Sequence, residues 1–504
     1  MAGRGGRGKV LFITIDQLAA RALDGDLAAF VDTPNLDRLA SWGTRFANHV
    51  TVTVPCGPAR ASLLTGLYAM NHRAVRNGAP LARHHATIAT EARKAGYEPL
   101  LFGYSDIAPD PTGMDPDDPD LSVYEGVAPG FREVVEMQLE AGHEWPAYLR
   151  ALGYDVEAPR GQAVPPAYRA ATPEGQAYSP SDPAIYAAEH SDTAYLTDRT
   201  LAALDVRRDR NWFAHVTYIR PHPPFVAPAP YNRMVNPADL PAPDLRTPAH
   251  PFVDAWFSAP TQTGLHWGFD GNCAGMAPER INELRAVYLG LLAEVDAHLG
   301  RLLDWLETTG QRDQTLIIVT SDHGEMLGEK RMWGKQTVFD PAFRVPLIIV
   351  DPTAKPGGDT DLPTESVDIA PTILEWIGVP VPQAMDGRSL RPLIAGTTPP
   401  DWRDNQFMEV DFAEPTRPTR FQDSLGWTIN TGGAAILAEA RWKYVHFGGG
   451  VPPMLFDLHA DPYETVDLAP DPAYADQITR LSRNLIDRMM ERRDRRLTGV
   501  AIGK

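Results

Sequence analysis

The sequence predicts an α/β protein: a large, mixed but mostly parallel β-sheet sandwiched by helices, with a smaller C-terminal α+β domain. Two observations predict this fold class. Over about the first 400 residues, short continuous apolar runs alternate with segments that carry helix start and stop signals, which is typical of parallel sheets buried on both faces. After about Asp401 the apolar runs are closely spaced, as in antiparallel hairpins. We therefore predict a large α/β domain at residues 1–400 and a C-terminal α+β subdomain at 401–504.

The first elements follow from local signals. Residues 10–15 form a continuous apolar run that predicts a buried strand. Thr33 then suits a helix N-cap, Pro34 the first helical turn and Gly43 the helix end. By the same reasoning we expect helices at residues 59–65 and 87–95, each closed by a glycine, and a strand at residues 98–103.

The alternation of strands and helices breaks down between residues 105 and 185. Residues 110–120 are dense in Asp and Pro, and the following stretch is rich in Gly, Pro and Ala. We interpret residues 105–185 as an irregular insertion, with a helix near residues 134–152, that serves as a lid or an oligomer contact. Beyond the insertion we expect helices at 191–204, 279–309 and 370–376, and strands at 212–218, 315–320 and 347–350.

The C-terminal subdomain has a different pattern. Residues 435–439 and 442–447 are two apolar runs separated by a short turn, which predicts a β-hairpin. Residues 455–458 are expected to add a strand to it. A helical pattern at residues 473–493 predicts a terminal helix, which is a second candidate for oligomer contacts.

Composition excludes several classes of protein. The net charge of −18 argues against a nucleic-acid-binding protein, which usually has a basic face. If the substrate is an anion, the site itself must supply positive charge. With two cysteines, Cys56 and Cys273, a disulfide framework is not expected. No stretch reaches the ~18 apolar residues of a membrane span, and the first apolar run is too short for a signal peptide. We therefore expect a soluble cytoplasmic protein.

Polar side chains follow four of the predicted strands. Because ligands bind at the carboxyl ends of strands in an open α/β sheet, these side chains are expected to meet at one edge. Asp16, Asp322 and His323 form a candidate site for one divalent cation. Two carboxylates and an imidazole suit Mn²⁺, with Ca²⁺ and Mg²⁺ as alternatives. The other residues at these ends are Gln17, Tyr104, Asp106, Arg220 and His222.

The stretch Cys56-Gly-Pro-Ala-Arg60 is the candidate nucleophile segment. Pro58 suits the first turn of a helix, which places Cys56 beside free backbone N–H groups that favour anions. Arg60 is expected to pair with substrate oxygens. Taken alone, these five residues favour a buried structural thiol.

With its neighbours, the segment resembles the signature of type I sulfatases in the alkaline phosphatase superfamily. In that family the cysteine of C-x-P-x-R is oxidised to formylglycine. The likeness continues from Cys56 through Ala-Ser-Leu-Leu-Thr-Gly-Leu-Tyr68 and covers nearly the whole chain. Other segments that fit are TPNLDRL at 33–39, TSDHGE at 320–325, WGK at 333–335, VDIAPTIL at 367–374 and LFDL at 455–458, with DP at 461–462.

Two pairs of residues indicate the subfamily. Sulfatases usually carry Asp-Asp after the first strand and Asp-Asn at the later metal site, whereas this chain has Asp16-Gln17 and Asp322-His323. These pairs, with VPCGPAR at 54–60 and YIRPHPPF at 218–225, resemble bacterial phosphonate monoester hydrolases, which also cleave phosphodiesters. The resemblance implies a homotetramer and maturation by a formylglycine-generating enzyme. It implies Asp16, Cys56 as formylglycine, Asp322 and His323 as metal ligands, and Gln17, Arg60, Asn77, Tyr104, His222 and Lys335 as pocket residues.

The resemblance also implies a mechanism. The formylglycine aldehyde hydrates to a diol, and one hydroxyl, activated by the metal, attacks phosphorus or sulfur and expels the alcohol. Arg60 and Lys335 offset the charge on the substrate oxygens, and His222 is the candidate acid or base. Asn77 and Tyr104 are expected to donate hydrogen bonds to the substrate.

One position departs from the family pattern. Two residues after the pocket tyrosine the family has a threonine, but this chain has Asp106. A carboxylate there repels an anionic substrate unless it faces away, caps a turn or meets a cationic leaving group.

Three alternatives remain open from the sequence. The first is an arylsulfatase or another sulfate-ester hydrolase on the same fold. The second is an enzyme with an unmodified nucleophile, as in nucleotide pyrophosphatases, but those favour Thr or Ser and need more Asp and His ligands than this chain offers. The third is a non-catalytic binding protein, which is disfavoured because every expected site position is filled.

Overall fold

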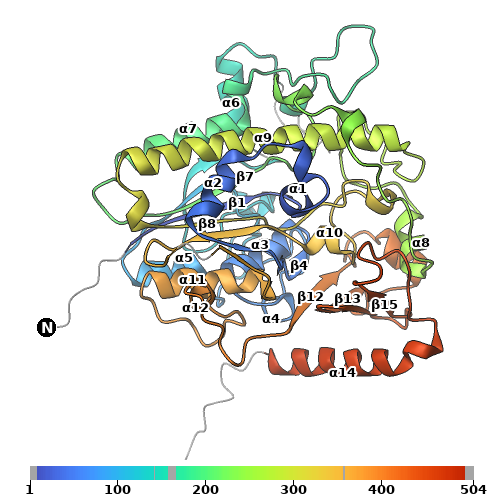
Figure 1. The fold of residues 1–504 in the computed structure, drawn as a ribbon. Helices are drawn as coiled ribbons and strands as arrows, with labels where there is room; N and C mark the ends of the chain where they lie inside the picture. The colour runs from blue at the N-terminus through green and yellow to red at the C-terminus, as the bar shows by residue number, and fades with distance from the viewer. Residues whose placement is uncertain (1–7, 141, 157–165, 356–357, 494–504) are drawn as a thin grey trace, which may run out of the picture.

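One large sheet contains the strands that the apolar runs of the first 400 residues predict (Figure 1). A computed structural model describes residues 8–140, 142–156, 166–355 and 358–493. In the described part, the sheet has eight strands in the order β10-β2-β9-β8-β1-β7-β5-β6. The strands are β1 Lys9–Ile15, β2 Thr44–Phe46, β5 Pro99–Gly103, β6 Arg132–Glu136, β7 Phe213–Tyr218, β8 Thr315–Thr320, β9 Leu347–Val350 and β10 Gly358–Thr360.

The central strands of this sheet are parallel. Strand β1 pairs in parallel with β7 on one side and with β8 on the other, and β5 joins β7 and β6 in the same direction. The exception is β9, which is antiparallel to both β8 and β2. The mixed, mostly parallel sheet expected from the sequence is thus confirmed. Its parallel centre aligns the carboxyl ends of β8, β1, β7 and β5.

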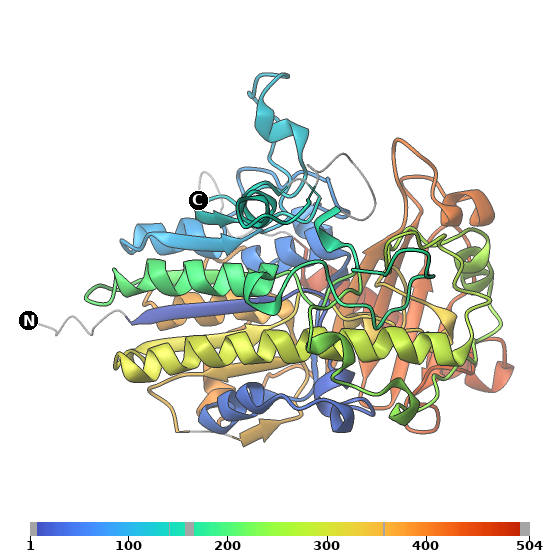
Figure 2. The same ribbon diagram turned by 90° about the horizontal axis from the view of Figure 1, so that it is seen from above.

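Helices cover both faces of the sheet, and β1 shows why. All its residues are buried. Leu11 and Ile13 pack into the core on one face, whereas Val10 and Phe12 pack into the core on the other. Figure 2 shows α7 and α9 side by side over the first face. The helices on the first face are α2 Pro34–Trp42, α7 Asp192–Asp205 and α9 Pro278–Thr308. The helices on the second face are α3 Cys56–Thr65, α5 Ile88–Lys94 and α11 Ile369–Trp376.

A second sheet has the order β15-β14-β13-β12-β4. The predicted hairpin is present as β13 and β14, and Leu481 and Leu485 of helix α14 pack with Leu437 against this sheet (Figure 1). Strand β4 comes from the N-terminal part and pairs in parallel with β12. The chain enters α3 directly from β4. The elements are β4 Thr53–Val54, β12 Asn405–Asp411, β13 Gly433–Glu439, β14 Trp442–Phe447, β15 Met454–Asp457 and α14 Ala475–Glu491.

The region predicted as an irregular insertion contributes an edge strand to the large sheet. The expected helix near residues 134–152 is limited to α6, Glu144–Ala151, and Arg132–Glu136 is β6. Within β6 only Val135 is fully buried, because an edge strand packs on few neighbours and carries charged residues. Residues 157–165 of the predicted insertion lie outside the described residues.

Helix α2 starts at Pro34 as predicted, whereas α3 does not start where predicted. Thr33 occupies the N-cap of α2 but its side chain makes no capping hydrogen bond. Helix α3 starts at Cys56 itself, three residues earlier than predicted. The remaining short elements are α1 Arg21–Asp24, β3 His49–Val50, α4 Ala69–His72, α8 Pro251–Phe257, α10 Asp340–Phe343, β11 Thr364–Glu365, α12 Arg391–Ile394 and α13 Arg420–Leu425. No helix in the described ranges, the 31-residue α9 included, is long and apolar enough to cross a bilayer.

A buried ion network links α14 and the segment before β12 to β11 and the turn that follows it. Arg403, whose side chain is 1% exposed, donates to Asp368 Oδ1 at 2.8 Å and lies 3.2 Å from Glu365 Oε2. Arg488 of α14 donates to Glu365 at 3.1 Å and to the Tyr68 hydroxyl at 2.9 Å. Two buried carboxylates therefore depend on two guanidinium groups.

We expect Arg403→Leu to lower the free energy of unfolding by about 3–5 kcal/mol, because it leaves two buried carboxylates without their main partner. The matched control is Arg480→Leu, which breaks a pair with Glu439 in which the Arg480 side chain is 45% exposed, and which should cost less than about 1 kcal/mol. Denaturant unfolding measures both. Equal effects of the two changes would contradict the expectation.

Candidate active site

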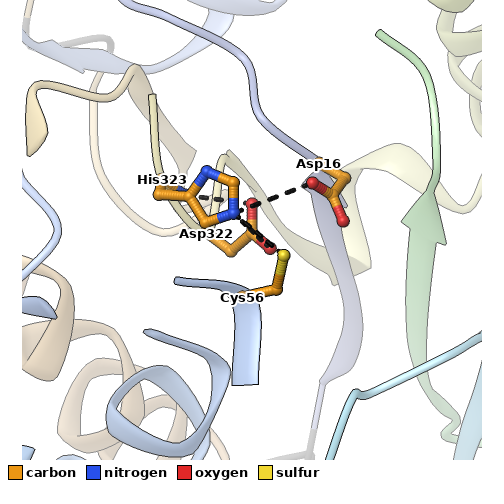
Figure 3. A group of neighbouring side chains, drawn as sticks. All are labelled: Asp16, Cys56, Asp322 and His323. Atoms are coloured by element: carbon orange, nitrogen blue, oxygen red, sulfur yellow. Dashed lines mark hydrogen bonds and ion pairs between the residues drawn. The ribbon is translucent and has the colours of Figure 1, made fainter. Parts of the chain in front are cut away.

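Four predicted ligands meet at the carboxyl edge of the large sheet (Figure 3). Asp16 follows β1, Asp322 and His323 follow β8, and Cys56 begins α3. One ligand atom from each residue lies within 4.8 Å of the others, and all four residues are buried. The sheet edge and the start of α3 therefore build one compact group.

These residues fit a divalent cation. Ligand atoms bound at about 2.0–2.6 Å to one ion lie up to about 5 Å apart, which matches the group. Asp16 Oδ1 is fully buried yet has no hydrogen-bond partner among the described residues. His323 Nδ1 donates to the Gly324 carbonyl at 3.0 Å, which leaves the lone pair of Nε2 directed at Cys56 Sγ, 3.1 Å away. The set offers carboxylate oxygens, one imidazole nitrogen and the side chain at position 56.

The environment of the group favours a neutral imidazole at His323 and an ionised carboxylate at Asp322, the protonation states in which both side chains can bind a cation. Burial lowers the pKa of His323 to about 4, so its imidazole is neutral at neutral pH. Burial acts to raise the pKa of Asp322, but His323, Arg60 and a hydrogen bond from the Gln17 N–H outweigh it and hold that pKa below its usual range. Burial and the Asp322 charge raise the pKa of Asp16. A cation would offset the charge of this close carboxylate pair.

Arg60 lies one turn after Cys56 on α3 and is fully buried. Its Nη2 donates to Asp16 Oδ2 at 2.9 Å, its Nε to Asp322 Oδ2 at 2.8 Å and its Nη1 to the Tyr104 carbonyl at 3.0 Å. The Tyr104 hydroxyl also donates to Asp16 Oδ2. In this arrangement Arg60 orients the two carboxylates. A bond from Arg60 or Tyr104 to a substrate oxygen stays a prediction.

Lys335 and His222 form a pair at the open side of the group. Lys335 Nζ donates to Gln17 Oε1 at 2.6 Å and lies 3.1 Å from His222 Nε2. His222 Nδ1 donates to the Pro223 carbonyl at 2.6 Å, so Nε2 accepts from Lys335. Desolvation and the Lys335 cation lower the pKa of His222 well below its usual range. The pair therefore combines a cation with a neutral proton acceptor.

Asn77 lies beside the start of α3, where its Oδ1 accepts from the Gly57 N–H at 2.9 Å. Asn77, His222 and Lys335 are partly exposed, whereas the predicted ligands beneath them are buried. These three residues therefore mark the side from which a substrate reaches position 56.

Sequence reasoning missed Glu325, which holds part of the site together. Its Oε1 accepts from the N–H groups of Gly334 at 2.6 Å and Leu327 at 3.1 Å, and its Oε2 accepts from Gln17 Nε2. Both ends of the Gln17 amide are thus fixed, one by Glu325 and one by Lys335. A carboxylate three residues after Asp322 within the TSDHGE segment was the available signal.

We expect Glu325→Gln to lower kcat/KM by about 10–100-fold with bound metal retained, because an amide cannot accept from all three donors and releases Gln17 and Lys335. The exposed Glu279, at the start of α9, gives the matched control Glu279→Gln, which should leave kcat/KM unchanged. Steady-state kinetics and metal analysis of both variants check this. Wild-type kcat/KM in Glu325→Gln would refute the positioning role.

Comparisons with known proteins agree with this geometry. A family model described as Sulfatase matches residues 9–379, and one described as N-sulphoglucosamine sulphohydrolase, C-terminal, matches residues 328–491. The multifunctional alkaline phosphatase superfamily protein PehA of Trinickia caryophylli is 39% identical over 510 residues, which covers 98% of this chain and 97% of that protein.

Two solved structures are similar over almost their whole length. The phosphonate monoester hydrolase SpPMH from Silicibacter pomeroyi has a TM-score of 0.92 at 48% identity, covering 97% of this chain and 96% of that one. The phosphonate monoester hydrolase of Agrobacterium radiobacter has a TM-score of 0.89 at 38% identity, covering 98% and 97%. Fold, site and relatives together define a hydrolase that acts on ester bonds. Within that class, the chain belongs to the sulfatase family of the alkaline phosphatase superfamily.

Proposed function

We propose that the protein hydrolyses phosphonate monoesters and phosphodiesters, and sulfate esters as secondary substrates. The nucleophile is formylglycine derived from Cys56, and the site holds one divalent cation. The observation that carries this proposal is the group of four candidate ligands for one cation, which includes His323. The Gln17 side chain is not part of this group, because it bonds to Glu325 and Lys335. The 48% and 38% identical phosphonate monoester hydrolases support the same substrate class.

Side chains of the protein orient the metal ligands, offset the charge of the ester and transfer protons. When bound, a divalent cation supplies Lewis-acid activation at position 56. Arg60 keeps Asp16 and Asp322 oriented, and Lys335 Nζ offsets the charge on the non-bridging oxygens of the ester. His222 Nε2 is the proton-accepting atom, and Lys335 Nζ, which donates to it, is the adjacent proton donor. Asn77 and Tyr104 complete the hydrogen bonds around the ester.

Parallel kinetics on three p-nitrophenyl esters test the proposal: a phosphonate monoester, a phosphodiester and a sulfate. We expect kcat/KM for both phosphorus esters to exceed that for the sulfate by at least about tenfold, a difference of 1.4 kcal/mol. The second candidate function is an arylsulfatase, which the Sulfatase family match favours. A higher kcat/KM for the sulfate would select it.

The partners and the cation are parts of the same proposal. Mn²⁺ suits a ligand set of two carboxylates and an imidazole, with Ca²⁺ and Mg²⁺ as alternatives. A formylglycine-generating enzyme is needed to oxidise Cys56. A homotetramer and a cytoplasmic location stay predictions; the exposed Ile486 and Met490 on α14 are candidate contact residues for the tetramer.

A further inference from the structure

Asp106 is a buried carboxyl that lacks a partner at the edge of the active site. It is 4% exposed, and no described residue donates a hydrogen bond to its Oδ1. Its backbone has φ = 53°, a left-handed conformation that is uncommon for residues other than glycine. An unsatisfied buried carboxyl and a rare backbone conformation both cost free energy, and such features gather at functional sites.

The position of Asp106 relates it to the nucleophile. Its carbonyl oxygen lies 3.2 Å from the point where a side chain on Gly57 would begin, so the loop packs on the first turn of α3. The Asp106 carboxyl is close enough to Cys56 for its charge to raise the pKa of that thiol. Ser105 Oγ donates to the Gly126 carbonyl at 2.8 Å, which anchors the loop from the other side.

The surroundings of Asp106 away from α3 are acidic. The charges of Asp106, Glu125 and Glu140 all raise the pKa of Tyr124, whose hydroxyl donates to Glu140 Oε1 at 2.7 Å. Glu125 accepts from the backbone N–H groups of Leu139 at 3.0 Å and of Glu140 at 2.9 Å. We define Asp106, Tyr124, Glu125 and Glu140 as the acidic corner.

Arg60 and Lys335 direct their hydrogen bonds to other groups, although the Arg60 charge lowers the pKa of Asp106. Arg60 directs its three nitrogens to Asp16, Asp322 and the Tyr104 carbonyl, and Lys335 bonds to Gln17 and lies against His222. An anionic ester at position 56 brings a further negative charge near Asp106. Burial and the Glu125 charge raise the pKa of the Asp106 carboxyl, and the Arg60 cation opposes them. A positive charge brought by the ligand would therefore favour the ionised form of this carboxyl.

We propose that Asp106 is a specificity residue that receives an ammonium group carried by the organic part of the ester. The preferred substrates are then zwitterionic phosphodiesters or phosphonate monoesters, with the cationic nitrogen in the acidic corner and the phosphorus at position 56. This inference rests on the proposed function. An ammonium group in this place accounts for a carboxyl that lies beside the position proposed for an anionic ester.

A matched pair of esters tests the inference. The choline ester of p-nitrophenyl phosphate carries a quaternary ammonium, and the 3,3-dimethylbutyl ester has the same shape without the charge. In the wild type, kcat/KM for the choline ester should exceed that for the neutral ester at least about tenfold, the effect of one charge-assisted contact. Asp106→Asn should bring this ratio of kcat/KM values close to one, because it lowers kcat/KM for the choline ester and leaves that for the neutral ester unchanged.

Two controls separate the outcomes. Asp117→Asn makes the same change on an exposed loop residue and should keep the wild-type ratio. Inhibition by phosphocholine, compared with 3,3-dimethylbutyl phosphate, measures the preference as binding, so it remains testable if neither ester turns over and the proposed function fails. A wild-type ratio near one in both measurements overturns the inference. So does an equal loss for both esters in Asp106→Asn, because the role of Asp106 would then not depend on the ammonium group.

Discussion

Replacing Cys56 by alanine is expected to lower kcat by about 10⁴-fold or more, because the change removes the nucleophile. Position 56 lies at the first turn of α3 within the ligand group, where alanine can neither be oxidised to an aldehyde nor contact a cation. Steady-state kinetics on a phosphodiester measure the loss. Peptide mass spectrometry of the active wild type should show formylglycine at position 56.

The chain supplies its own control for this experiment. Cys273 is the other cysteine and is also buried, but it lies outside the ligand group, so Cys273→Ala should retain activity. Cys56→Ser tests whether a hydroxyl alone suffices, and we expect it to be as inactive as Cys56→Ala. An unmodified thiol in fully active wild-type protein would exclude formylglycine as the nucleophile.

Removing the divalent cation should lower kcat/KM by about 10³-fold, because Lewis-acid stabilisation of the transition state contributes several kcal/mol. It should also lower stability: a cation present at 1,000 times its Kd stabilises the folded state by about 4 kcal/mol. The physical cause is the buried pair Asp16 and Asp322, whose repulsion the cation relieves. Chelation, metal analysis and thermal unfolding with and without Mn²⁺ measure these effects.

Asp322→Asn should reproduce the effects of chelation by removing one carboxylate ligand. Asp313→Asn makes the same chemical change at an exposed residue in the turn before β8 and should bind metal normally. Full activity in protein shown by metal analysis to be free of cations would refute a metal-dependent mechanism.

The sequence predicted best the elements that are buried on both faces. Strands β1 and β8 are continuous apolar runs because helices cover both sides of them. Strand β6 was missed because only Val135 of its residues is fully buried, and β2 and β10 are three residues long. The length and burial of a strand, rather than the strand propensity of its residues, decided whether it could be predicted from the sequence.

The same contrast holds for the site. Asp16, Asp322 and His323 could be predicted to meet because they follow parallel strands whose ends align. The contacts of Glu325 and Asp106 could not be predicted, although the sequence marked Asp106 as a departure from the family pattern, since these contacts depend on how the loops fold. Glu325 turns to Gln17 and the Gly334 N–H, and Asp106 packs on Gly57. Nothing in residue type or spacing specifies these contacts.

The pairing of β4 with β12 sets a time order for biosynthesis. All residues of α3 are buried in the finished fold, so if Cys56 is oxidised as proposed, the oxidising enzyme must reach it before the second sheet closes. The partner strand of β4 is synthesised about 350 residues later, which at 5–20 residues per second leaves a window of about 20–70 s. Maturation of the nucleophile and completion of the C-terminal sheet are therefore in competition, and slow translation of the last hundred residues would favour the oxidised enzyme.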